Sequence, residues 1–89
     1  MTERIASGPG EAMSALSGEI RAVLLEFADA PDAPDAPLEL ESLVVVQLVE
    51  ALEDRFGFVA RAAELGPENL GTLAALTAWV DRRARGGPA

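Results

Sequence analysis

Three prolines stand within seven residues, in Pro31-Asp32-Ala33-Pro34-Asp35-Ala36-Pro37, and this segment divides the chain into two parts. Proline fixes φ and has no backbone N–H to donate, so a helix cannot continue through the segment. The sequence therefore predicts an extended connector, similar to a polyproline helix. We expect Leu38 and Leu40, which follow it, to anchor its far end to the core.

The part before the connector carries one helical pattern. Apolar residues recur at spacings of three and four, which predicts a helix over residues 11–28 with one buried stripe. The stripe holds Met13, Leu16, Ile20, Val23, Leu24 and Phe27. Residues 1–10 include Ser7-Gly8-Pro9-Gly10 and have no periodicity, which indicates a flexible leader.

A second helix is predicted over residues 43–56, with Ser42 as its N-cap and Gly57 as the left-handed residue at its end. One face is apolar and is assigned to the core. It holds Val45, Leu48, Val49, Leu52 and Phe56. The opposite face is polar and acidic, with Gln47, Glu50, Glu53 and Asp54. Leu43 and Val46 project on this acidic side near Ser42, and two exposed hydrophobic residues there suggest a contact surface.

The remainder of the chain predicts one short and one long helix. Residues 58–66 have no clear period. The short helix is predicted from Pro67 to Leu70, with proline at its first position. The last helix is predicted to follow, with Thr72 as its N-cap. That helix turns Leu73, Leu76 and Val80 to the core, places Trp79 on its flank as a packing residue, and leaves Asp81, Arg82 and Arg83 in solvent. Arg82, Arg83 and Arg85 complement the helix C-terminus, and residues 85–89 form a flexible tail.

No segment alternates as a strand does, so the predicted fold is all-α. Three main helices and one short helix form a bundle with a long first loop, in one domain over residues 11–84.

Composition excludes several classes of function. The chain of 89 residues has 15 acidic and 7 basic residues, and its net charge of −8 disfavours nucleic acids and anionic membranes but favours basic protein surfaces. No apolar stretch approaches the roughly 20 residues of a membrane helix. The chain has no cysteine and no histidine, so we expect no metal site and no catalytic residue. We expect a cytoplasmic monomer.

The segment from Pro37 to Val80 resembles the acyl and peptidyl carrier protein family. The family has an Asp-Ser-Leu motif at the start of its second helix, and this chain has Glu41-Ser42-Leu43 followed by apolar residues at the family's spacing. Leu65-Gly66-Pro67-Glu68-Asn69-Leu70 is similar to the Leu-Thr-Pro-Glu-Asn-Phe of many polyketide-type carriers. Three positions depart from the family: Glu41 replaces the usual aspartate, Glu39 a common glycine, and Ala60-Arg61 a common Ile-Pro pair.

The resemblance implies a covalent phosphopantetheine arm on Ser42, attached by a separate phosphopantetheinyl transferase that uses a metal ion and coenzyme A. It also implies that the second helix docks on basic surfaces of the enzymes that load and modify the cargo. The residues implied in docking are Glu41, Leu43, Val46, Gln47, Glu50, Glu53 and Asp54. Gln47 stands where many fatty-acid carriers have an acid. With the three departures, this favours a discrete carrier of a specialised biosynthetic pathway, with polyketide or other natural-product assembly as its setting.

Other interpretations stay open from the residues themselves. A serine at a helix start is most often only a cap, and an acidic helix face is most often only solvated. The cargo can be acyl, as the acidity slightly favours, or aminoacyl, as in nonribosomal pathways. An unmodified acidic helical module that binds a basic partner is the competing function. An enzyme has no support, because no nucleophile is paired with a base.

Overall fold

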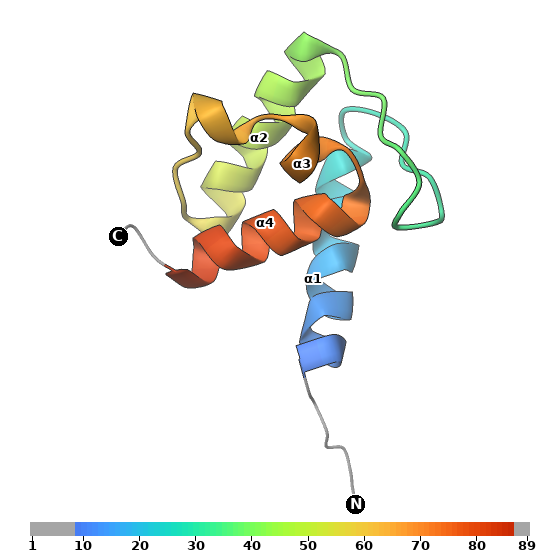
Figure 1. Cartoon of the computed structure of the whole chain (residues 1–89), viewed down its shortest axis with the longest axis vertical. Helices are drawn as coiled ribbons and strands as arrows, with labels where there is room; N and C mark the ends of the chain where they lie inside the picture. The colour runs from blue at the N-terminus through green and yellow to red at the C-terminus, as the bar shows by residue number, and fades with distance from the viewer. Residues whose placement is uncertain (1–8, 87–89) are drawn as a thin grey trace, which may run out of the picture.

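The computed structural model describes residues 9–86, and within them the chain is a bundle of helices without a strand (Figure 1). The prediction of an all-α fold is confirmed. The elements are α1 (Pro9–Leu24), α2 (Ser42–Phe56), a single 3-10 turn η1 (Ala62–Glu64), α3 (Pro67–Leu70) and α4 (Leu73–Gly86).

The ends of α1 differ from the prediction. The helix begins at Pro9, two residues before the predicted start, and proline suits this position because the first N–H of a helix has no partner within it. It ends at Leu24, four residues early. There Glu26 and Phe27 donate their N–H groups to the carbonyls of Val23 and Leu24, so the chain tightens into a turn. Residues 1–8 and 87–89 of the predicted leader and tail lie outside the described residues. Arg85 and Gly86, which were predicted to begin the tail, belong to α4.

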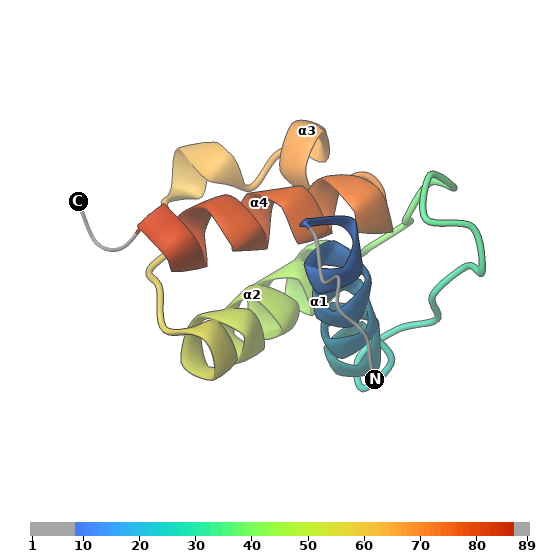
Figure 2. The same cartoon turned by 90° about the horizontal axis from the view of Figure 1, so that it is seen from below.

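The core forms where α1, α2 and α4 meet. α1 and α4 cross at a steep angle, and α2 lies beside both of them (Figures 1 and 2). The predicted apolar stripes supply most of the buried residues, which are Ile20, Val23, Leu24, Leu48, Val49, Leu52, Phe58, Leu70, Leu73, Leu76, Trp79 and Val80.

Two aromatic residues correct the predicted core. Trp79 is only 1% exposed and lies inside the bundle, not on its flank. Phe58, in a segment that has no period, packs edge-on against the Trp79 ring with ring centres 5.4 Å apart. The two rings therefore form one core contact between α4 and the segment that follows α2.

The proline-rich connector is tied to the beginning of α4. Leu38 donates its N–H to the carbonyl of Gly71 at 2.7 Å, and Ala74 donates to the carbonyl of Pro34 at 2.8 Å. Leu38 and Leu40 are half-buried against the core, as predicted. The connector thus reaches α2 along a fixed path. It is not extended throughout, which corrects the prediction, because Ala36 donates its N–H to the carbonyl of Ala33 at 3.1 Å and closes a turn.

Candidate functional site

Ser42 lies at the exposed start of α2, which is the upper end of this helix in Figure 1. The residues before it are extended and alternate: Leu38 and Leu40 turn inward, whereas Glu39 and Glu41 are exposed. This alternation follows from the period of two in an extended chain. It delivers the serine to the surface next to the exposed Glu41.

Ser42 is not the N-cap of α2, which corrects the prediction. The N-cap is Glu41, with extended φ and ψ of −73° and 156°, and its side chain makes no capping hydrogen bond. Ser42 is the first helical residue. Within the described residues its hydroxyl forms no hydrogen bond to another side chain or to the backbone. The hydroxyl is therefore exposed and not committed to holding the helix.

The first turn of α2 has N–H groups that need an acceptor. Its first intrahelical hydrogen bond runs from the N–H of Val45 to the carbonyl of Glu41 at 2.9 Å, so the three preceding N–H groups have no partner within the helix. With no side chain capping them, these groups and the helix dipole favour an anion at this end. A phosphodiester on the Ser42 oxygen fits such surroundings.

The outer face of α2 carries the exposed hydrophobic residues that the sequence predicted. Leu43 is 67% exposed and Val46 is 50% exposed. Gln47, Glu50 and Asp54 are also exposed on this helix. Together with Glu41 these residues form a continuous apolar and acidic surface that begins beside Ser42, which we call the outer face of α2.

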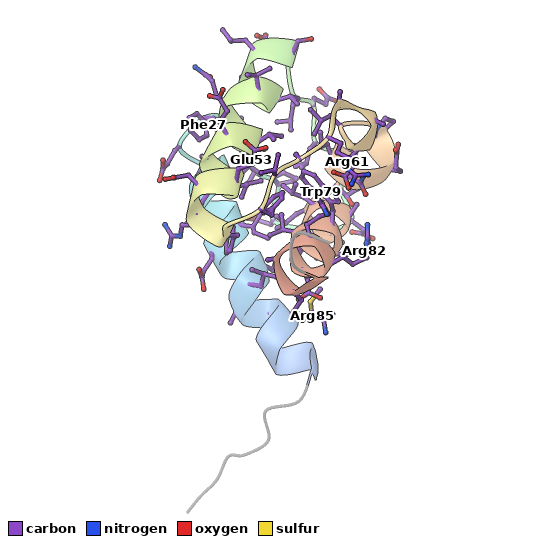
Figure 3. All side chains as sticks on the ribbon, turned by 90° about the vertical axis from the view of Figure 1, so that its left-hand side faces the viewer. Phe27, Glu53, Arg61, Trp79, Arg82 and Arg85 are labelled. Atoms are coloured by element: carbon purple, nitrogen blue, oxygen red, sulfur yellow. The ribbon has the colours of Figure 1, made fainter. Side chains whose placement is uncertain are left out.

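Glu53 differs from the other acids of α2. It is half-buried, and its Oε2 accepts the backbone N–H of Ala60 at 2.7 Å. Its carboxylate therefore holds the segment after α2, and Figure 3 shows its side chain on the side of the helix that meets this segment. Glu53 is the one predicted docking acid that the fold also uses internally.

A groove of about 200 Å³ adjoins the start of α2. It lies between the end of the connector, α2 and α3, and its lining residues are Leu38, Leu40, Val45, Leu65, Gly66, Pro67, Leu70 and Gly71. Most of these side chains are apolar.

The turn η1 is braced from α4. Glu64 accepts the N–H of Arg61 at 2.9 Å, and this hydrogen bond holds the pKa of Glu64 below its ordinary value of 4.5. Arg83 lies 3.3 Å from the other oxygen of Glu64 and acts in the same direction, whereas partial burial opposes both. Arg83 also donates to the carbonyl of Val59. It is half-buried and not in solvent, which corrects the prediction.

No group of three or more potential ligands is placed to hold a metal ion within residues 9–86. No helix in this same part of the chain is long and apolar enough to cross a membrane.

Comparison with known proteins identifies one family. The family described as phosphopantetheine attachment site matches residues 17–80, which is most of the chain and includes Ser42. No curated protein and no solved structure matches the chain.

Proposed function

The chain belongs to the phosphopantetheine attachment family, and from this premise we propose that Ser42 carries the arm and that the protein presents acyl or aminoacyl intermediates to partner enzymes. Domains of this family are substrates that carry the prosthetic group and are not catalysts. The arm supplies the thiol that this cysteine-free chain lacks, and it holds cargo as a thioester.

The observation that carries the proposal is the exposed Ser42 hydroxyl at the uncapped start of α2. In the attachment reaction this oxygen attacks the phosphoryl group next to pantetheine in coenzyme A. The pyrophosphate bond breaks, adenosine 3′,5′-bisphosphate leaves, and the serine proton passes to a base of the transferase. The N–H groups of the first helical turn then face the new phosphodiester.

The outer face of α2 supports a docking role near the arm. Exposed ion pairs contribute only about 0 to 1 kcal/mol each, so Glu41, Glu50 and Asp54 act mainly on encounter rate and orientation. Leu43 and Val46 supply the apolar contact. A surface of this kind gives weak binding that exchanges readily. The arm then raises the effective concentration of its cargo at each partner's active site.

The cargo and pathway are the finer part of the proposal. The chain departs from the family at Glu39, Glu41 and Ala60-Arg61, and these departures favour a discrete carrier of a specialised natural-product pathway. The neutral Gln47 weakens recognition by the partners of fatty-acid carriers. We also propose that the protein is cytoplasmic and monomeric. The acidity favours acyl cargo over aminoacyl cargo. Intact mass spectrometry of the protein from its native host identifies the arm and the group attached to it.

The attachment is tested in vitro. Purified protein is incubated with coenzyme A, Mg²⁺ and a broad-specificity phosphopantetheinyl transferase, and intact mass is measured. We expect one phosphopantetheinyl group on the wild type and none on Ser42→Ala. Ser14→Ala, which changes an exposed serine of α1, is the matched control and should be modified as the wild type is. An unchanged wild-type mass would disprove the proposal, and modification of Ser42→Ala would disprove the assignment of the site.

A further inference from the structure

The peptide group between Val59 and Ala60 is held from two sides. Its N–H, from Ala60, donates to the carboxylate of Glu53 at 2.7 Å, and its carbonyl, from Val59, accepts from the guanidinium of Arg83 at 2.5 Å. Glu53 belongs to α2 and Arg83 to α4. Two charged side chains of opposite sign, from two helices, thus fix the position of one peptide group in a connecting segment.

The side chain on this fixed peptide group points outward. Val59 is 73% exposed, which makes it the most exposed large hydrophobic residue within the described part of the chain. A hydrophobic side chain in water gains free energy when a partner covers it. Because the backbone of Val59 is already fixed, little conformational entropy is lost in that step. Val59 therefore has the properties of a preorganised binding contact.

A pocket of about 560 Å³ lies beside Val59. Its lining residues are Glu53, Asp54, Gly57, Phe58, Val59, Arg61 and Arg83. Glu53 is bound to Ala60, and Arg83 is bound to Val59 and paired with Glu64. Asp54 and Arg61 are the remaining charges at the pocket.

Arg61 is exposed, and across residues 9–86 it forms no ion pair with a carboxylate. Figure 3 shows its side chain apart from that of Glu53, near the end of the molecule that carries η1. Arg61 is also where the chain departs from the Ile-Pro pair that is common in its family. The pocket therefore combines an apolar contact with an exposed cation, whose charge also helps to lower the pKa of Glu64.

We propose that Val59 and Arg61 form a second docking surface, which binds a segment of a partner protein that has an apolar side chain next to a carboxylate. The apolar side chain covers Val59 and enters the pocket, and the carboxylate pairs with Arg61. Asp54, at the same pocket, repels that carboxylate and so sets the direction of the bound segment.

This surface differs in charge from the outer face of α2. It lies beside the last turns of α2, where Glu53 holds Ala60, whereas the outer face begins at Ser42. A partner with a uniformly basic surface is disfavoured at Arg61, so the second surface selects among partners that the acidic face alone would accept. The proposal does not depend on modification at Ser42.

The test is an NMR titration of ¹⁵N-labelled Ser42→Ala protein, which has no arm, with two peptides. The acidic probe is acetyl-Gly-Asp-Leu-Asp-Gly-amide and the basic probe is acetyl-Gly-Lys-Leu-Lys-Gly-amide. We expect the acidic probe to cause saturable shifts in residues 57–61 that weaken as salt is added. The basic probe should leave these residues unchanged. Any of three results would overturn the proposal: shifts centred on Arg82 and Arg85, equal shifts with both probes, or no shift at millimolar peptide.

Matched variants distinguish binding at Val59 and Arg61 from nonspecific electrostatic binding of the acidic peptide elsewhere on the protein. Val59→Ser and Arg61→Gln change exposed side chains and keep every backbone hydrogen bond, so both should fold, and each should weaken the acidic probe about tenfold. Leu25→Ser, at a residue that is 51% exposed, and Arg82→Gln are the controls and should bind as the parent does. Unchanged affinity in Val59→Ser or Arg61→Gln, or equal losses in the controls, refutes the assignment.

Discussion

The carboxylate of Glu53 accepts the backbone N–H of Ala60 at 2.7 Å, across the turn that ends α2 at Gly57. Helix periodicity places Glu53 on the polar side of α2 with Glu50, and both acids have the same chemistry. The structure separates them, because Glu50 is exposed whereas Glu53 is half-buried and bound to the backbone. A loss of partner binding on mutation of Glu53 can therefore reflect a displaced segment as well as a lost charge.

Replacing Glu53 by alanine should lower the free energy of unfolding by about 1 to 2 kcal/mol, because the N–H of Ala60 loses its acceptor in a half-buried site. Urea unfolding measures this value. Glu50→Ala is the matched control on the same helix and should stay within about 0.5 kcal/mol of the wild type. Equal stability of the two variants would show that the Glu53 hydrogen bond is not needed for the fold.

Substitutions at Ser42 and Glu41 should show which of these residues caps α2. Ser42→Ala should leave the free energy of unfolding within about 0.5 kcal/mol of the wild type, since the hydroxyl is not a cap. Glu41→Asp should raise it by about 0.5 to 1 kcal/mol, because the shorter carboxylate can accept the uncapped N–H groups that glutamate leaves unbound. Thermal unfolding of the unmodified proteins is the measurement. A loss of about 1 kcal/mol in Ser42→Ala would contradict the assignment of Glu41 as the N-cap.

Phe58 should be essential to the stability of the core because it packs against Trp79, although it lies in a segment without helical periodicity. Phe58→Ala should lower the free energy of unfolding by about 3 kcal/mol or more, through the cavity it leaves. Val59→Ala, at the next residue and on the surface, is the control, with an expected change below about 0.5 kcal/mol. In a double-mutant cycle with Trp79→Leu, the edge-to-face pair should contribute about 0.5 to 1.5 kcal/mol. A cycle that closes with no coupling would be the contrary result.

Glu64 should make part of the stability depend on pH. Its pKa in the folded protein lies below the ordinary 4.5, first because of the hydrogen bond from Arg61, so the folded state binds the proton less tightly than the unfolded state. The contribution is complete above pH 4.5 and is lost as the pH falls through the folded value. Urea unfolding between pH 7 and pH 3 should show a shallower decline for Glu64→Gln than for the wild type, whereas Glu68→Gln, at an exposed acid of α3, should follow the wild type. Parallel curves for Glu64→Gln and the wild type would exclude the effect.

Much of the fold follows from local patterns in the sequence. The apolar stripes place α1, α2 and α4, and Gly57 marks the end of α2, because these are effects of neighbouring residues. The prolines exclude a helix from the connector, although α1 already ends at Leu24. Thr72 caps α4 as predicted, since its hydroxyl accepts the N–H of Ala75 at 3.0 Å. The exposure of Leu43 and Val46 also follows from their angle on the helix.

The features that the sequence did not predict depend on contacts between distant segments. Phe58 and Trp79 are buried because they cover each other, and no helical period relates them. Helix periodicity predicts that Arg83 faces solvent, but its guanidinium donates a hydrogen bond to the carbonyl of Val59, which is 24 residues away in the chain. Ser42 and Glu41 are one residue apart at a helix start, where capping preferences alone do not fix which residue is the cap.

The hydrogen bonds from Leu38 to Gly71 and from Ala74 to Pro34 give the two halves of the connector different tolerance to changes in length. Extra residues placed just before Pro34 enlarge an exposed arc, and the entropy of closing such an arc rises only slowly with its length. Extra residues after Leu38 instead move Ser42 relative to α3. A peptide tag or a fluorophore therefore belongs before Pro34, where it leaves the serine in register, and natural variation in loop length is expected to accumulate at the same place.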